Sequence, residues 1–107
     1  MLYVDHRTYT FKPLKMGKWL ALYEEAALPV QLKYLGKPLG AFTSAVGPLN
    51  QFTHLWGFDD MGEFERRHAA RDKDPDWPAY LQASEHLIMA QETRLIRRVE
   101  MMSLKGQ

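Results

Sequence analysis

The sequence LGAFTSAVGPLNQFTHLWGF, residues 39–58, decides the fold of this chain, because it predicts a β-hairpin. Two runs of strand-like composition, residues 39–46 and 51–58, flank the sequence GPLN at residues 47–50, which combines residues that break strands and form turns. We therefore expect two antiparallel strands joined by a loop longer than two residues.

The second run of the hairpin has an aromatic face. Side chains alternate between the two faces of a strand, so every second residue of 51–58 shares a face. The face with the large side chains consists of Phe52, His54, Trp56 and Phe58. A single imidazole lies among three aromatic rings, which indicates a buried face and identifies no reaction.

The composition is typical of one ordinary domain that spans residues 1–107. The chain has 46% hydrophobic and 25% charged residues, and its length suits one core and is short for two. With 14 basic and 13 acidic side chains, the formal net charge is +1. Charge alone therefore gives no attraction to nucleic acid or to an anionic membrane, and we expect neither as a partner.

The chain contains no cysteine, which excludes disulfides, thiolate nucleophiles and zinc sites built on sulfur. No apolar run approaches the roughly 20 residues of a membrane-spanning helix. The N-terminus lacks the basic region and the apolar core of a secretory signal. The expected location is the cytoplasm.

A strand and a helix precede the hairpin. Residues 2–11 alternate with the β-branched and aromatic content that suits a strand. Pro13 fits the first turn of a helix, whose apolar stripe recurs at three- and four-residue steps until Pro29 ends or kinks it. We expect residues 30–35 to add one short turn before Gly36 stops the helix.

A second helical segment and a last strand follow the hairpin. Asp60 and Glu63 have the capping-box spacing, in which the Asp60 side chain accepts from the Glu63 N–H and Glu63 reaches back. Asp76 and Pro78 start a further short helix. Residues 89–99 form the last strand.

The order of the elements is β-α-β-β-α-β, which predicts a ferredoxin-like α+β fold. Four antiparallel strands in the spatial order 4-1-3-2 then carry both helical segments on one face. The other face stays open, and strands that are apolar on both sides expose a larger patch than a monomer usually tolerates. We therefore expect a second copy to cover that face, in a homodimer or a higher even-numbered assembly.

Short motifs along most of the chain resemble the NIPSNAP family. They are Asp5-His6-Arg7-Thr8-Tyr9, Leu39-Gly40, Gly47-Pro48-Leu49-Asn50, His54-Leu55-Trp56 with Phe58, Arg66-Arg67, and Asp74-Pro75 with Trp77 and Tyr80. The most specific of them is G-x-L-N-x-x-x-H-L-W. The resemblance implies a dimeric α+β barrel, in agreement with the topology expected above. Enzymes of the wider superfamily include monooxygenases, so the resemblance also suggests a cofactor-independent monooxygenase-type enzyme.

Three residues are candidates for chemistry. His54 is a candidate general base or ligand contact that shares its face with Asn50, and the alternative is a buried histidine bonded within the sheet. Arg7 and Tyr9 form a candidate clamp for an anion or a carbonyl group, and the alternative for Arg7 is a cross-strand ion pair with Glu92. The histidines show no metal-ligand spacing, so we expect no metal and no cofactor.

Two functions from different classes stay open. The first is a protein that binds a small organic ligand, or converts it without a cofactor, in a pocket between the sheet and the helices. The expected lining of that pocket is Trp19, Tyr23, Asn50, His54, Trp56 and Phe64. The second is a non-catalytic, homodimeric protein-interaction module. The sequence does not decide between an enzyme and a binding protein.

Overall fold

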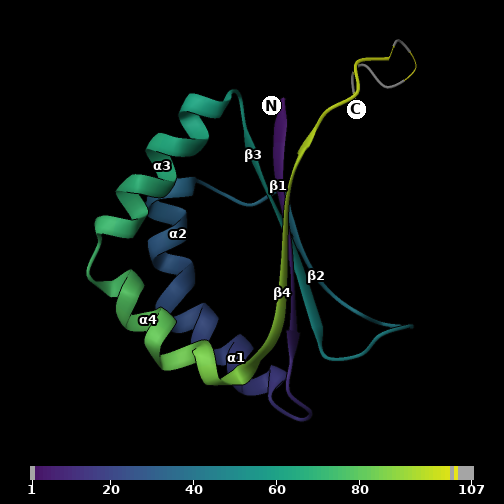
Figure 1. Cartoon of the computed structure of the whole chain (residues 1–107), viewed down its shortest axis with the longest axis vertical. Helices are drawn as coiled ribbons and strands as arrows, with labels where there is room; N and C mark the ends of the chain where they lie inside the picture. The colour runs from purple at the N-terminus through teal and green to yellow at the C-terminus, as the bar shows by residue number, and fades with distance from the viewer. Residues whose placement is uncertain (1, 102, 104–107) are drawn as a thin grey trace.

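The computed structural model describes residues 2–101 and 103 and contains a four-stranded antiparallel sheet (Figure 1). The strands are β1 (Tyr3–Phe11), β2 (Gly40–Thr43), β3 (Gln51–Phe58) and β4 (Ile88–Arg97). Their order across the sheet is β2-β3-β1-β4, which confirms the predicted order. The helices lie together on one face of the sheet, so the predicted α+β, ferredoxin-like class is confirmed as well (Figure 1).

β2 and β3 form the predicted hairpin. β3 has the predicted bounds and buries every second side chain, whereas β2 is shorter than predicted and ends at Thr43, opposite Phe52. The connecting loop contains Gly47 at φ +103° and Asn50 at φ +60°. Both residues lie in the left-handed region, which lets the chain turn within the loop and return to β3.

The first helix begins later than predicted. A turn precedes it, in which the Lys15 N–H donates to the Lys12 carbonyl at 3.0 Å and Leu14 has φ +67°. A residue in the left-handed region cannot continue into a right-handed helix. The helix therefore starts at Met16, and Pro13 lies in the turn.

Three helical elements separate β1 from β2. They are α1 (Met16–Leu22), the π-helical turn η1 (Tyr23–Ala27) and α2 (Leu28–Leu35). The helix does not end at Pro29, one of the two predicted outcomes, because these elements follow one another without a break. In η1 the Leu28 N–H donates to the Tyr23 carbonyl, five residues back. This wider turn directly precedes Pro29, which lies in the first turn of α2, and Gly36 ends α2 as predicted.

Three further helical elements lie between β3 and β4. They are α3 (Met61–Lys73), α4 (Asp76–Ser84) and the 3-10 turn η2 (Glu85–Leu87). Asp60 Oδ1 accepts from the Glu63 N–H at 2.7 Å, which confirms the predicted cap, but the Glu63 carboxylate accepts from the Asp59 N–H at 2.7 Å rather than from Asp60. At the start of α4 the accepting side chain is Asp74 rather than Asp76, because Asp74 Oδ1 takes the Asp76 N–H at 2.9 Å.

β4 begins and ends slightly earlier than predicted and pairs with β1. The register places Glu92 opposite Thr8, the neighbour of Arg7. The side chains of Arg7 and Glu92 therefore point to opposite faces of the sheet, and the predicted ion pair between them is wrong. Glu92 lies 3.6 Å from Arg94 instead, and Arg7 lies 3.0 Å from Asp5.

The two faces of the sheet differ in polarity and burial. The face beneath the helices carries the aromatic core, in which Trp19, Trp56 and Phe58 are almost fully buried. The outer face is less apolar than predicted, since it includes Thr8 and Thr53, whose hydroxyl groups lie 3.1 Å apart. Within the part of the chain that the structure describes, no helix has the length and apolar character needed to cross a membrane.

Candidate functional site

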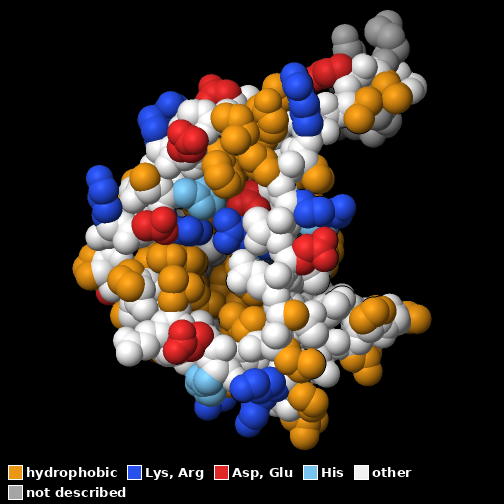
Figure 2. All heavy atoms as spheres, viewed as in Figure 1, with side chains coloured by type: hydrophobic (Ala, Val, Ile, Leu, Met, Phe, Trp, Pro, Cys, Tyr) orange, Lys and Arg blue, Asp and Glu red, His pale blue; other side chains and the backbone are white. Residues whose placement is uncertain are grey.

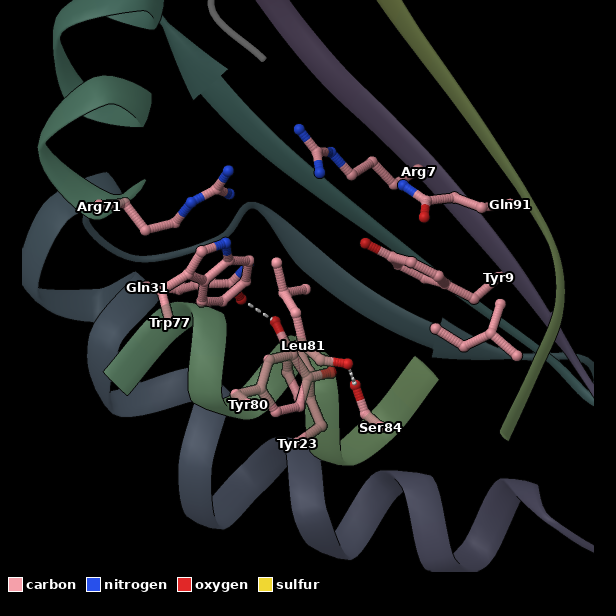
Figure 3. Close-up of a pocket in the computed structure, with 11 residues that line it drawn as sticks. Arg7, Tyr9, Tyr23, Gln31, Arg71, Trp77, Tyr80, Leu81, Ser84 and Gln91 are labelled. Atoms are coloured by element: carbon pink, nitrogen blue, oxygen red, sulfur yellow. Dashed lines mark hydrogen bonds between the residues drawn. The ribbon is translucent and has the colours of Figure 1, made fainter. Parts of the chain in front are cut away.

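A cavity of about 250 Å³ lies between the sheet and the helices (Figure 3). The side chains that define it come from β1, η1, α3 and α4 and are Arg7, Tyr9, Tyr23, Arg71, Trp77 and Tyr80. We call it the arginine cavity. In the space-filling view a hollow opens between the helices and the sheet, with charged and histidine side chains on one wall and hydrophobic side chains below them (Figure 2). Among the residues described as lining this cavity, none is a carboxylate.

Arg71 is the most unusual side chain of the arginine cavity. It is only 7% exposed, and its guanidinium carbon lies 4.3 Å from the centre of the Trp77 ring. Its Nε and Nη2 atoms donate to Asp72 Oδ1 at 3.2 and 3.0 Å. The third nitrogen, Nη1, is buried and has no hydrogen-bond partner among residues 2–101 and 103. Burial lowers the pKa of Arg71, although an arginine stays charged at neutral pH.

Arg7 faces Arg71 from the opposite side of the cavity (Figure 3). Its Nε atom lies 3.1 Å from both carboxylate oxygens of Asp5, and its Nη2 atom lies 3.0 Å from Asp5 Oδ2. Burial acts to lower the pKa of Arg7, but the bonds to Asp5 outweigh it and the pKa lies above the ordinary value. Asp5 thus fixes one edge of the guanidinium group and turns the rest of it toward the cavity.

Asp5 also contacts His68 on α3. The His68 Nε2 atom lies 3.4 Å from Asp5 Oδ2 and 3.4 Å from Arg7 Nη2. The His68 Nδ1 atom carries a hydrogen, because it lies 2.8 Å from the Phe64 carbonyl, which can only accept. Burial acts to raise the pKa of Asp5, but the bonds to His68 and Arg7 outweigh it and the pKa falls below its usual value.

Two tyrosines of the cavity, Tyr23 and Tyr80, stay protonated. Burial raises the pKa of Tyr23 and of Tyr80 far above the usual value. The Tyr23 hydroxyl donates to Gln31 Oε1 and lies 3.3 Å from His54 Nδ1. Tyr23 belongs to the π-helical turn η1, so the widened turn sets the position of this hydroxyl. These two tyrosines therefore act as neutral hydrogen-bonding groups.

His54 lies outside the arginine cavity, on the wall of a second one. Its Nδ1 atom accepts from the Trp56 indole N–H at 3.1 Å, so the hydrogen of the neutral ring is on Nε2. Burial lowers the pKa of His54 to about 3. Near pH 7 the ring is neutral and does not take up a proton. His54 is therefore a neutral hydrogen-bonding group and is poorly suited to act as a general base.

The structure divides the expected site residues between several places. Arg7, Tyr9 and Tyr23 come together in the arginine cavity, whereas His54 and Trp56 share the second cavity with Tyr23. Three others line neither cavity. Trp19 packs in the core, and its ring centre lies 4.8 Å from that of Tyr23. Phe64 packs on Phe58 and His68. Asn50 lies in the hairpin loop, where its carbonyl accepts from the Phe11 N–H.

Sequence reasoning missed Asp5, His68 and Arg71 as site residues. One signal was available for the first, because Asp5 and Arg7 are two residues apart on a strand and must share a face. A signal also existed for His68 and Arg71, because positions 64, 68 and 71 recur at helical spacing and place these side chains on one side of α3. Within the described ranges, no group of three or more His, Cys, Asp or Glu side chains is placed to hold a metal ion.

Comparison with known proteins places the chain among NIPSNAP proteins. The model of a protein family described as NIPSNAP matches residues 4–102. A NipSnap homolog from Dictyostelium discoideum is 38% identical over 74 residues, which cover 66% of this chain and 31% of that protein. The chain therefore spans about a third of the length of this curated relative.

Solved structures share the fold. A NIPSNAP family protein from Agrobacterium tumefaciens superposes with a TM-score of 0.88 at 28% identity, over 98% of this chain and 100% of that one. A putative antibiotic biosynthesis monooxygenase from Nitrosomonas europaea gives a TM-score of 0.68 at 10% identity, over 92% and 90% of the two chains. At that identity the second likeness concerns the fold alone.

Proposed function

The chain belongs to the NIPSNAP family, and we propose that it binds a small organic anion, an aromatic carboxylate, in the arginine cavity. The observation that carries the proposal is a cavity lined by two guanidinium groups, Arg7 and Arg71, one of which has a buried donor, Arg71 Nη1, without a partner among the described residues. A buried polar group that lacks a partner is costly, so an oxygen ligand at this atom would remove a penalty.

The cavity also suits the rest of such a ligand. A guanidinium group matches a carboxylate in geometry, since two N–H groups can donate to its two oxygens. Trp77 and Tyr80, whose rings lie 5.4 Å apart, supply an aromatic wall. The volume of about 250 Å³ lies just below the usual range of small-molecule sites, roughly 300–1,000 Å³, so the ligand is small.

The side chains favour binding over turnover. General acid–base catalysis at neutral pH works best with a group whose pKa lies near 7. Tyr23 and Tyr80 have raised pKa values, the arginines stay protonated, and the pKa of the nearby His54 is about 3. We therefore rank a ligand-binding protein above a cofactor-independent monooxygenase-type enzyme.

Thermal unfolding in the presence of benzoate, with benzamide as a neutral analogue of the same shape, tests the proposal. A ligand at a hundredfold excess over its Kd stabilises by about 2.7 kcal/mol, which raises the Tm of a domain of this size by about 10 °C or more. We expect that shift with benzoate, and we expect Arg71→Gln to remove it. Arg66→Gln, at an exposed position of the same helix, should retain it. Equal shifts with benzoate and benzamide would contradict the proposal.

The alternative function, a non-catalytic homodimeric interaction module, is favoured by a different observation. The β2–β3 hairpin extends away from the helices (Figure 1). It exposes apolar side chains, with Phe42 at 56%, Val46 at 94% and Leu49 at 67%. Together with the outer face of the sheet, this hairpin supports the expectation of a homodimer or a higher even-numbered assembly. Light scattering at micromolar concentration tests it, and a mass of 12.5 kDa would contradict it.

A further inference from the structure

The second cavity, on the other side of Tyr23, has a chemistry of its own. Its volume is about 260 Å³, and it lies between η1, α2, β2 and β3. Its floor consists of the buried rings of Tyr23, Phe52, His54 and Trp56. Its rim is formed by the partly exposed side chains of Leu20 and Leu28 and by the exposed Glu24. We call it the histidine cavity.

The floor of the histidine cavity contains a hydrogen-bond donor that no described residue uses. His54 Nδ1 accepts from the Trp56 indole, and the hydrogen of the Tyr23 hydroxyl goes to Gln31. The hydrogen of the neutral imidazole is therefore on Nε2, which is buried and has no partner among residues 2–101 and 103. Buried polar atoms in native proteins nearly always have a partner, so an orphan donor on a residue that lines a cavity points to a missing acceptor.

The acceptor has to belong to a neutral molecule. The wall offers no cation, because the imidazole is neutral and no lysine or arginine is among the residues described as lining the cavity. Glu24 at the rim repels a carboxylate, and transfer of an isolated charge onto an apolar floor is costly. A carbonyl oxygen accepts a hydrogen bond without carrying a charge, and aromatic rings on the floor favour a flat molecule.

We propose that the histidine cavity is a second binding site, which takes a neutral aromatic carbonyl compound of the ketone or quinone class whose oxygen accepts from His54 Nε2–H. The proposal does not depend on the binding of an anion in the arginine cavity. The two cavities share Tyr23 but select for opposite properties, since one is lined by two guanidinium groups and the other by a single neutral donor.

Binding of acetophenone tests the proposal against ethylbenzene, which has the same ring and lacks the oxygen. We expect acetophenone to bind about tenfold more tightly, the change that one net hydrogen bond supports. In NMR spectra of the whole chain the ring Nε2–H signal of His54 and the indole signal of Trp56 should move. The indole signal of Trp77, which packs on Arg71 in the arginine cavity, should stay in place.

Each other outcome is informative. Equal affinities for the two compounds, or no binding of acetophenone at millimolar concentration, would overturn the proposal. A shift of Trp77 with no shift of Trp56 would overturn it as well, because the ligand would then occupy the arginine cavity. His54→Phe removes the donor and should abolish the preference for acetophenone; if this variant does not fold, the spectra of the unmodified chain decide.

Discussion

Replacement of Asp5 by asparagine tests the idea that the arginine cavity depends on one buried carboxylate. The substitution keeps the shape of the side chain and removes its charge. Asp5 is 1% exposed and receives both the guanidinium group of Arg7, at 3.0–3.1 Å, and the imidazole of His68, at 3.4 Å. In the variant Arg7 keeps its charge and loses its only anionic contact among the described residues.

The structure sets the size of the expected loss. Removal of one partner of a buried ion pair costs about 3–5 kcal/mol, because the other charge stays buried and uncompensated. The Arg7 side chain is 15% exposed, so water offsets part of this cost and we expect about 3 kcal/mol for Asp5→Asn. For a domain of this size such a loss lowers the Tm by more than 10 °C, at roughly 4–8 °C per kcal/mol.

Urea unfolding followed by circular dichroism measures this loss against a matched control. Glu92 and Arg94 are also a carboxylate and an arginine two residues apart on a strand, but their side chains are 72% and 59% exposed. An exposed pair contributes between 0 and about 1 kcal/mol, so Glu92→Gln should leave the unfolding midpoint nearly unchanged. Equal midpoints for Asp5→Asn and Glu92→Gln would refute the assignment of Asp5 as the buried anchor of Arg7.

The pH dependence gives a second check with a definite sign. The pKa of Asp5 in the folded chain lies below the value of 3.8 in the unfolded chain, so its charge contributes stability that is fully present above pH 3.8. That contribution is lost as the pH falls through the folded pKa. The difference between the unmodified chain and Asp5→Asn should therefore shrink in acid, and a constant difference down to pH 2 would contradict the assignment.

Three further predictions concern other parts of the chain. Trp56→Ala should cost about 3–5 kcal/mol in urea unfolding, because the indole is 1% exposed, and an unchanged midpoint would contradict its role in the core. The His54 ring should not titrate between pH 5 and 8 by NMR, since its pKa in the folded chain is about 3. Because the value in the unfolded chain is 6.5, the free energy of unfolding should fall as the pH drops below 6.5. Asp60→Ala should cost about 1 kcal/mol by loss of the cap on Glu63, and Asp60→Asn should restore most of it.

Several elements of the fold could be predicted from the sequence because local periodicity and capping patterns mark strands and helices. The alternation of residues 51–58 identified β3 and its buried face, and the spacing of Asp60 and Glu63 identified the start of α3. The sequence failed at Pro29, where a local rule predicted a break. The helical segment continues past the proline with a π-helical turn directly in front of α2. No pattern of residue types in the sequence predicted that turn.

The candidate site was predicted only in part. Alternation along one strand put Arg7 and Tyr9 on the same face, and both line the arginine cavity. The sequence paired Arg7 with Glu92, because it could show that β1 and β4 are neighbours but could not give their register. A shift of one residue in register moves a side chain to the other face of the sheet. The register itself is set by the backbone pairing of β1 with β4, which the sequence pattern does not show.

The chemistry of the site was decided by tertiary structure. Arg7 and His68 are 61 residues apart in the chain and meet because α3 packs across the sheet. The neutral state of His54 likewise follows from burial, and its tautomer follows from the indole of Trp56. Sequence alone determined which side chains face the interior, since that depends on the repeat of a helix or a strand. Which interior groups touch, and hence which atom is left without a partner, depends on how the elements pack.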